Sequence, residues 1–418
     1  MKKNVWIFNH YAGLMFFNHG GRHYNFAKHL KQSGYEPVLF CANSKHSAEG
    51  HWFEDDSVWH EHLAEEIGVP FVFVKARTYT GNGKSRVLNM VDFYYGVQKA
   101  AKQYAAKHGK PDIIYASSVH PLTLVAGIQL AKHFGVKCIC EVRDLWPETI
   151  VEFSSRFTKK HPIIKVLYQG EKWIYKKADQ LIFTMEGAYN YIIEQGWEKE
   201  IPYSKVSYIN NGVDLEAFAR NCEQYQVQDP DLEDPHTFKV LYTGSIRPVN
   251  RVDQLIGCAK HLKAYPDIKI IVYGQGSELE RLKQETTEAR LENLVFKGAV
   301  NKKYVPYILS KSNLNILNYR ADVSILRFGS SQNKMFEYLA SGRPILSSIS
   351  MEYSPIEKFN CGIVKKLTQD EEYAQEILKF YSLSEQDYQA LCDNAQTAAR
   401  EYDFKNLTKK LIEVIEKA

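Results

Sequence analysis

Short apolar runs alternate with amphipathic stretches along the first half of the chain. The runs have the length of strands, and the segments after them carry apolar residues at helical spacing. The predicted strands are residues 4–9, 37–41, 71–74, 112–116, 137–142, 180–184 and 205–209. The predicted helices are residues 22–34, 86–108, 123–134, 162–177 and 187–195, and residues 43–68 fit neither pattern. This alternation predicts a parallel sheet that is covered on both faces and binds ligands at the carboxyl ends of its strands.

A polar, acidic stretch interrupts this pattern, which then restarts. Residues 217–236, which include NCEQYQVQDPDLEDPH, have the composition of a linker. Further strands are predicted at residues 239–242, 268–273, 294–296, 314–317 and 344–346, and helices at 385–402 and 404–417 close the chain. We therefore expect an α/β protein with two Rossmann-like, doubly wound domains, residues 1–216 and 237–402, facing each other across a cleft. That cleft is the expected ligand site.

Composition and charge exclude several classes of protein. The chain has 418 residues, which is enough for two or three domain cores, and its 44% hydrophobic and 24% charged residues are ordinary for a globular protein. A net charge of +4 does not indicate a nucleic-acid partner, although it is compatible with contact to an anionic membrane. Seven scattered cysteines, an odd number, favour a reduced, cytosolic protein. No apolar run approaches the roughly 18 residues of a membrane span.

The stretch from Ser324 to Leu346 carries the strongest local signal. Its loop FGSSQN leads into a predicted helix, NKMFEYLASG, whose free N–H groups and dipole favour an anion at the N-terminus. Glu337 lies one turn inside that helix, where a carboxylate is compatible with a phosphate only if it binds a neutral, hydroxyl-rich part of the same ligand, such as a ribose. The alternative is an ordinary connection whose glutamate caps the helix or pairs with a lysine.

Other strand-end loops carry groups suited to a diphosphate. The loop TGSIR contains Arg247, with Arg251 close behind, and a guanidinium offers a planar fork of donors, although a surface arginine is the simpler interpretation of this loop alone. Gly274 begins a GQG that lacks the third glycine and the acidic residue of a dinucleotide fingerprint. In the first half, Gly20 and Gly21 precede a helix, where glycine lets the backbone approach a ligand.

Two further strand ends in the first half gather polar side chains. His120 follows the strand at 112–116 and is placed to contact a sugar hydroxyl, although a structural role is the default for any one of 14 histidines. The strand at 137–142 is followed by a run of polar and aromatic groups that is unusual for a turn: Arg143, Asp144, Trp146 and Glu148.

Asp229 and Asp231 have the spacing of a DxD metal motif, but no strand precedes them, so we expect a solvated loop and no metal.

The segment 157–177 is both basic and aromatic. Its sequence, FTKKHPIIKVLYQGEKWIYKK, forms an apolar helical face flanked by lysines. A core helix with a solvated basic face is the first interpretation. Contact of the lysines and Trp173 with an anionic membrane surface is the second.

Several motifs together resemble one enzyme family. NNGVD stands before the linker, TGSIR follows the first strand of the second domain, EVRDLWPE spans residues 141–148, and SQNKMFEYLASGRP begins at Ser331. With the tandem α/β domains, they resemble the retaining GT-B glycosyltransferases of family 4 over nearly the whole chain. EVRDLWPE and SQNKMFEYLASGRP resemble a subgroup that builds bacterial capsule, O-antigen and exopolysaccharide, the WbuB-like fucosamine transferases.

The resemblance implies roles for matching residues. Glu337 would hold the ribose hydroxyls, His120 would lie near the donor sugar, and these two are the expected catalytic residues. The first domain would be the acceptor side, with a closing helix at 403–418 crossing back to it. The donor-binding residues expected from the loops and the resemblance together are Gly20, Gly21, Ser245, Arg247, Arg251, Gly274, Lys297, Gln332, Asn333, Lys334 and Glu337. The expected acceptor-side residues are Arg143, Asp144, Trp146 and Glu148.

The chain also departs from the family pattern. The usual E-x7-E pair would place its first glutamate at Gly329, so the sugar must be oriented by other means. The usual arginine and lysine for the pyrophosphate fall at Ser245 and Asn250, and Arg247 and Arg251 lie close enough in sequence to substitute.

We therefore expect a retaining, metal-independent transferase with no cofactor, whose donor is a nucleotide diphosphate sugar, with UDP-sugars favoured. The expected acceptor is a polyprenyl-diphosphate-linked sugar or glycan. The expected location is the cytoplasm, with peripheral contact to the inner membrane surface. The alternatives are a sugar-nucleotide epimerase of the same fold, a non-catalytic sugar-nucleotide-binding protein and, least favoured, a dinucleotide-dependent oxidoreductase.

Overall fold

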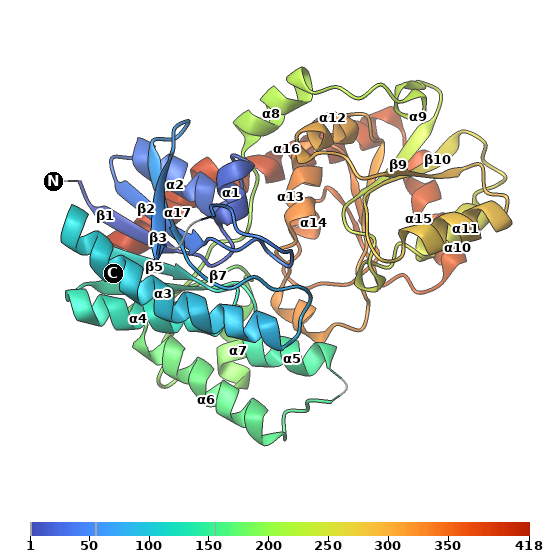
Figure 1. Ribbon diagram of the computed structural model, residues 1–418. Coiled ribbons are helices and arrows are strands. Elements are labelled where there is room, and N and C mark those ends of the chain that lie inside the picture. The colour runs from blue at the N-terminus through green and yellow to red at the C-terminus, as the bar shows by residue number, and fades with distance from the viewer. Residues whose placement is uncertain (1, 55–56, 155) are drawn as a thin grey trace. The chain divides into compact units, whose positions relative to one another are not determined.

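The computed structural model describes residues 2–54, 57–154 and 156–418, and Figure 1 shows their arrangement. The chain divides into two compact units. Unit 1 runs to Asn210 and includes Phe404–Ala418, and unit 2 is Asn211–Asp403. Each unit is a predominantly parallel sheet between helices, which confirms the predicted pair of α/β domains.

The sheet of unit 1 has the strand order β3-β4-β2-β1-β5-β6-β7-β8. Neighbouring strands are parallel, except that β3 pairs antiparallel with β4 at one edge. The strands are β1 (Asn4–Phe8), β2 (Glu36–Ala42), β3 (Trp59–Ala64), β4 (Val69–Val74), β5 (Ile113–Ser117), β6 (Lys137–Val142), β7 (Gln180–Phe183) and β8 (Val206–Tyr208). The central strands are buried on both faces, which explains why they are continuous apolar runs in the sequence.

Helices cover both faces of this sheet (Figure 1). They are α1 (Gly13–Phe17), α2 (Arg22–Gln32), α3 (Lys84–His108), α4 (Pro121–Phe134), α5 (Trp146–Phe153), α6 (Pro162–Lys177), α7 (Ala188–Glu194) and α17 (Phe404–Lys417). The C-terminal helix α17 packs on α2, with the rings of Phe26 and Phe404 5.5 Å apart. Glu416 of α17 accepts hydrogen bonds from Lys3 Nζ at 2.6 Å and from the Tyr35 hydroxyl at 2.5 Å.

The sheet of unit 2 is entirely parallel, in the order β11-β10-β9-β12-β13-β14. Its strands are β9 (Phe238–Thr243), β10 (Ile268–Tyr273), β11 (Leu294–Gly298), β12 (Leu314–Leu317), β13 (Ile345–Ser347) and β14 (Gly362–Val364). Its helices are α8 (Leu215–Gln224), α9 (Pro230–Glu233), α10 (Gln254–His261), α11 (Leu279–Glu288), α12 (Val305–Ser310), α13 (Asn333–Ala340), α14 (Pro355–Lys358), α15 (Asp370–Tyr381) and α16 (Glu385–Glu401). The main core lies between the sheet and α10, α11 and α15, and a smaller one between the sheet, α9 and α12.

Two sequence-based interpretations of chain segments change here. Residues 217–236 do not form a linker of loop structure, because they contain most of α8 and all of α9, and Leu232 is buried in the smaller core of unit 2. The unassigned stretch 43–68 supplies the edge strand β3, apart from residues 55–56, which lie outside the described residues. Among the described residues, none of the helices is long and apolar enough to cross a membrane.

Candidate functional sites at the carboxyl edges of the two sheets

In unit 2, the loops that follow β9 and β10 are packed backbone against backbone. A Cβ on Gly274 would lie 1.8 Å from the carbonyl oxygen of Gly244, and one on Gly276 would lie 2.1 Å from that of Ile246. The Ile246 N–H donates to the Gln275 carbonyl at 2.9 Å, which closes the contact. The GQG motif is therefore required by the approach of two loops within the fold, independently of any ligand at Gly274.

The polar side chains of the loop after β9 differ in whether they have a hydrogen-bond or ion-pair partner within the protein. Ser245 Oγ donates to Asn250 Oδ1 at 2.8 Å. The family usually has its arginine and lysine at these two positions, and here the two side chains are hydrogen-bonded to each other. Arg251 Nε lies 3.1 and 3.2 Å from the carboxylate oxygens of Asp253. The exposed Arg247 guanidinium has no hydrogen bond or ion pair to any described residue. Arg247 is thus the more accessible of the two predicted phosphate ligands.

Helix α13 begins without a side-chain cap. Gln332 is the N-cap residue, in extended conformation, and its side chain accepts no hydrogen bond from the first turn. The opposite face of the helix is fixed by buried apolar residues and by the Tyr338 hydroxyl, which accepts from Thr243 N at 3.0 Å and donates to Thr243 O at 3.2 Å. The first N–H groups of α13 are thereby held at the carboxyl edge of the sheet, next to the end of β9, as an anion site requires.

Glu337, one turn inside α13, forms an ion pair with Lys302. Lys302 Nζ lies 3.1 Å from Glu337 Oε1, and the lysine side chain is 67% exposed. This pairing is the one that the simpler interpretation of Glu337 anticipated. Because an exposed ion pair is worth little, it leaves the glutamate able to accept hydrogen bonds from a ligand. Lys334, in the same turn, lies with Nζ 4.5 Å above the Tyr242 ring and 3.2 Å from its hydroxyl.

The acidic pair Asp229 and Asp231 is not the solvated loop that the sequence predicted. Lys297 Nζ lies 2.7 Å from Asp229 Oδ1 and 2.5 Å from Asp231 Oδ2, and Asp231 also pairs with Lys269. The Tyr273 hydroxyl donates to Asp229 as well. These carboxylates therefore neutralise lysines of the sheet. A donor contact by Lys297 would have to compete with both of them.

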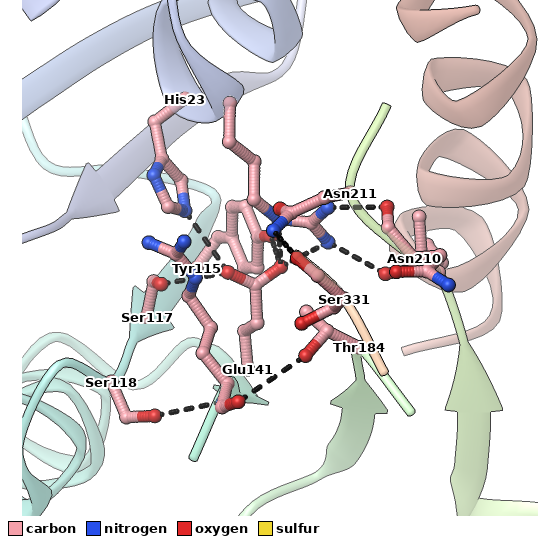
Figure 2. Close-up of polar contacts among 12 residues, drawn as sticks. His23, Tyr115, Ser117, Ser118, Glu141, Thr184, Asn210, Asn211 and Ser331 are labelled. Atoms are coloured by element: carbon pink, nitrogen blue, oxygen red, sulfur yellow. Dashed lines mark hydrogen bonds and ion pairs between the residues drawn. The ribbon is translucent and has the colours of Figure 1, made fainter. Parts of the chain in front are cut away.

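In unit 1, a buried polar cluster lies at the carboxyl edge of the sheet, and Figure 2 shows its members converging on Glu141. Glu141, at the end of β6, is fully buried and accepts hydrogen bonds from Arg22 Nε at 2.8 Å and Nη2 at 2.5 Å. Three other side chains also bond to it: His23 through Nε2 at 3.1 Å, Ser117 through Oγ at 2.7 Å, and the Tyr115 hydroxyl. Burial alone would raise the pKa of Glu141, but the Arg22 charge and the hydrogen bonds from His23 and Arg22 hold it well below its usual value.

Arg22 also joins the start of α2 to the segment directly after β8. Its guanidinium donates to the carbonyl oxygens of Asn210 at 2.5 Å and Ile209 at 2.8 Å. Gly21, directly before it, has φ 104°, and a Cβ there would be strained and 3.1 Å from Met15 Cγ. A Cβ on Gly20 would make an ordinary contact, 3.6 Å from the Asn18 carbonyl oxygen. The two glycines thus lead the chain into α2, and the positive φ angle at Gly21 requires a glycine at that position.

The predicted sugar contact His120 is fully buried and bonded to a second histidine. His120 Nε2 lies 2.6 Å from His10 Nδ1, and 3.4 Å from Thr123 Oγ1. Burial, followed by the Arg86 charge, lowers the pKa of His120 to about 3, so both rings are neutral near pH 7 and one donates to the other. His120 is thus held in place by its bond to His10, and its contact with a donor sugar stays a prediction.

The predicted acceptor-side residues differ in how much of them is accessible. Glu148 is buried and bonded to Tyr168 and, at 2.6 Å, to Lys159, so it joins α5 to α6. Trp146 Nε1 donates to the Val119 carbonyl at 3.0 Å. Arg143 is half-buried and Asp144 is exposed. Arg143, Asp144 and Trp146 are therefore partly accessible, and the indole N–H of Trp146 is already bonded within the protein.

Sequence reasoning missed four residues of these sites: His10, Arg22, His23 and Glu141. The signal for Arg22 and His23 was their place directly after the glycine pair, and for Glu141 it was a carboxylate at the end of an otherwise apolar strand. Among the described residues, no group of three or more histidines, cysteines, aspartates or glutamates is arranged to hold a metal ion.

Comparisons with known proteins agree with this architecture. The model of Glycosyltransferase Family 4 matches residues 22–217, and that of Glycosyl transferases group 1 matches residues 226–401. A search of the curated proteins gives no match.

Solved structures of similar fold cover the full length of the chain. Sucrose-phosphate synthase from Thermosynechococcus elongatus has a TM-score of 0.70 at 16% identity, over 100% of this chain and 99% of that one. HepE of Anabaena in complex with UDP has 0.64 at 14% identity, over 100% of both chains. Trehalose 6-phosphate synthase from Burkholderia multivorans has a TM-score of 0.68 at 14% identity, over 100% of this chain and 99% of that one. At these identities the likeness shows the fold, and with both family models it leads to one conclusion: the chain belongs to the family 4 glycosyltransferases of GT-B fold.

Proposed function

We propose that this protein transfers a sugar, with retention of configuration, from a UDP-sugar to a lipid-linked or glycan acceptor in bacterial surface polysaccharide synthesis. The observation that carries the proposal is the uncapped N-terminus of α13 with Glu337 one turn inside it. HepE, whose fold is similar at 15% identity, has been solved with UDP-glucose, which supports UDP as the nucleotide.

The donor fits this edge of unit 2 by charge and hydrogen bonding. The diphosphate would accept hydrogen bonds from the first N–H groups of α13, at Gln332 and Asn333, where the helix dipole favours negative charge. The Arg247 guanidinium, which has no partner among the described residues, would supply a planar fork of donors. The carboxylate of Glu337 would accept hydrogen bonds from the two ribose hydroxyls and exchange its exposed pairing with Lys302 for them.

The reaction then needs little from the protein besides positioning and charge stabilisation. The acceptor hydroxyl oxygen forms a bond to the anomeric carbon on the face from which the diphosphate departs, and the bond from that carbon to the phosphate oxygen breaks. The departing phosphate oxygen takes the proton of the acceptor hydroxyl, so no strong protein base is required. Positive charge and helix N–H groups stabilise the diphosphate as it leaves, and the proposal includes no metal.

The acceptor would lie on unit 1, at Arg143 and Asp144, and the protein would work in the cytoplasm against the inner membrane surface. Helix α6 supports membrane contact, because Ile163, Val166 and Trp173 are exposed apolar residues on a helix rich in lysine. Lys160 and Lys165 have no side-chain partner among the described residues, so their charge is available to anionic lipids.

A thermal-shift panel of UDP-, GDP-, CMP- and dTDP-sugars tests the donor site. A ligand at about 100 times its Kd adds about 2.7 kcal/mol to the folded state, which corresponds to a rise of about 5–10 °C for a domain of this size. We expect the rise with a UDP-sugar, and we expect Glu337→Ala to remove most of it. Glu292→Ala, which changes an exposed glutamate of the same unit, is the matched control. If Glu337→Ala keeps the full shift and turnover, the ribose role is wrong.

Product analysis separates transfer from its rivals. Purified protein, bacterial membranes and the UDP-sugar that gives the largest shift are expected to yield a membrane-extractable glycolipid. Conversion of the UDP-sugar without membranes would instead identify an epimerase. Binding without any product from membranes of several capsule-forming bacteria would identify a non-catalytic binding protein.

A further inference from the structure

Unit 1 contains a cavity whose apolar walls have no role in the donor and acceptor chemistry above. It has a volume of about 410 Å³ and lies among α4, α5 and α6, which Figure 1 shows next to one another on unit 1. Its walls include Leu122, Val125, Pro147, Leu167 and Ile174. The volume falls in the range of sites that enclose small organic ligands, about 300–1,000 Å³.

Two of the polar side chains in the cavity wall, Glu171 and Trp146, have hydrogen-bond partners within the protein. The carboxylate of Glu171 accepts hydrogen bonds from the hydroxyls of Tyr175 and Tyr191, each at 2.6 Å. Burial raises the pKa of Glu171 to about 7, so the side chain is close to half neutral at physiological pH. Trp146, also in the wall, donates its one side-chain N–H to the Val119 carbonyl. An interior with its polar groups satisfied in this way favours hydrocarbon over water.

The lining of the cavity includes two chemically different groups of residues. Ser118 and Asp144 follow β5 and β6 at the carboxyl edge of the sheet, and Asp144 is next to the proposed acceptor residue Arg143. Val166 and Trp173 belong to α6 and are 69% and 40% exposed. The lining thus includes residues of both the proposed acceptor site and the exposed apolar face of α6.

We propose that this cavity holds the first part of the isoprenoid chain of a lipid-linked acceptor. This inference rests on the proposed function. A hydrocarbon chain matches the apolar walls, the polar head of the lipid would emerge at Ser118 and Asp144, and the chain would continue past Trp173 into the membrane. Lys160, just before α6, and Lys165, on α6, have no side-chain partner among the described residues, and their charge complements the anionic surface from which such a lipid comes.

Gly170 offers a substitution that obstructs the cavity without disturbing the fold. It lines the cavity on α6, and a Cβ added there would meet no atom within 4 Å. Gly170→Leu would extend a branched side chain into this open space. Gly170→Ala is the matched control, because it makes the same change of backbone freedom and adds one methyl group only.

Calorimetric titration of the full-length protein with farnesyl phosphate tests the proposal. We expect the wild type and Gly170→Ala to bind with Kd values within about twofold of each other, and Gly170→Leu to bind about tenfold more weakly. Sodium phosphate alone is expected to give no binding at this site. Each variant is also titrated with UDP, which should bind all three equally.

The outcomes distinguish this inference from the proposed function. If farnesyl phosphate does not bind the wild type, or binds Gly170→Leu as tightly as Gly170→Ala, the cavity does not hold the chain, and the donor site stands as long as UDP binds. Loss of UDP binding by the wild type would overturn the proposed function itself. Equal weakening of farnesyl phosphate and UDP by Gly170→Leu would mean that the substitution disturbs the fold, and it would refute the cavity as the local cause.

Discussion

Replacing Arg22 by methionine is expected to be among the most damaging single substitutions in unit 1. Arg22 and Glu141 are 2% and 0% exposed, and their closest atoms are 2.5 Å apart. Methionine fills a similar apolar volume but leaves the Glu141 carboxylate buried without its cationic partner. The other donors to Glu141, including His23 and Ser117, are neutral hydrogen-bonding groups and cannot replace the charge.

The expected loss follows from two terms. Removing one partner of a buried ion pair costs about 3–5 kcal/mol, because the remaining charge has no compensation. Arg22 also donates to the carbonyls of Ile209 and Asn210, and a buried carbonyl without its donor costs about 1–3 kcal/mol, less where water reaches it. Because these terms overlap, we expect a total of about 4–6 kcal/mol, which is comparable to the whole stability of many domains.

Hydrogen exchange measured against urea concentration is the suitable assay, because it reports unit 1 separately through the amides of β5 and β6. Lys137→Met is the control. Lys137 begins β6, the strand that also contains Glu141, and it pairs with Asp179 at 2.9 Å while 59% exposed. Its loss is expected to cost less than about 1 kcal/mol. The double variant Arg22→Met/Glu141→Leu should be at least about 2 kcal/mol more stable than the sum of the single effects predicts.

A specific result would refute this reasoning. If Arg22→Met unfolds at the same urea concentration as Lys137→Met, the buried charge is not what holds the edge of this sheet. Strict additivity in the double variant would likewise show that the two side chains do not act as a pair.

Three further outcomes follow from the packing and the charges. Gly274→Ala should destabilise unit 2 by about 3 kcal/mol in urea unfolding, because its Cβ would lie 1.8 Å from a backbone oxygen, while Gly170→Ala should not destabilise unit 1. Lys297→Met should lower the exchange protection of β10 by about 1–3 kcal/mol, because it leaves the buried Asp229 without its lysine. The stability of unit 1 should fall as pH is lowered from about 6.5 to about 4, because burial lowers the pKa of His23 to about 4, so in this window the unfolded chain binds a proton that the folded chain does not. The loss from His23 is about 3 kcal/mol, and a pH dependence of the unfolding midpoint that His23→Gln leaves unchanged across that range would contradict it.

The fold class and most strands could be predicted from the sequence because the central strands are buried on both faces and so appear as apolar runs. The predicted strand at 268–273 is the observed β10, for example. The strand β3 was missed because it is an edge strand whose residues, WHEHLA, are mostly half-buried and polar. Helix α9 was missed because Asp229 and Asp231 are neutralised by Lys269 and Lys297 of neighbouring strands, and no local pattern reveals partners so far away.

In the candidate sites, too, only features that lie within one short stretch of sequence could be predicted. The start of α13 and Glu337 could be predicted because a loop, a helix and a carboxylate lie within one short stretch of chain. The pairing of Arg22 with Glu141 joins residues 119 apart in sequence, and that of His10 with His120 joins residues 110 apart. A sequence indicates that each of these residues is unusual, but only the packed sheet shows which one it meets.

The absence of a glutamate at position 329 also has its cause in the backbone. Gly329 has φ 101°, a conformation that a residue with a Cβ adopts only under strain, and its N–H donates to the Leu326 carbonyl at 3.0 Å. The loop between Gly329 and α13 is held again by Asn211, whose side-chain amide donates to the Ser331 carbonyl at 2.6 Å. A glutamate at 329 would therefore require a different loop, and a different loop would move the N-terminus of α13 on which the diphosphate site depends. The proposed donor site keeps that helix start and its ribose carboxylate, Glu337, and it orients the sugar without a carboxylate at 329.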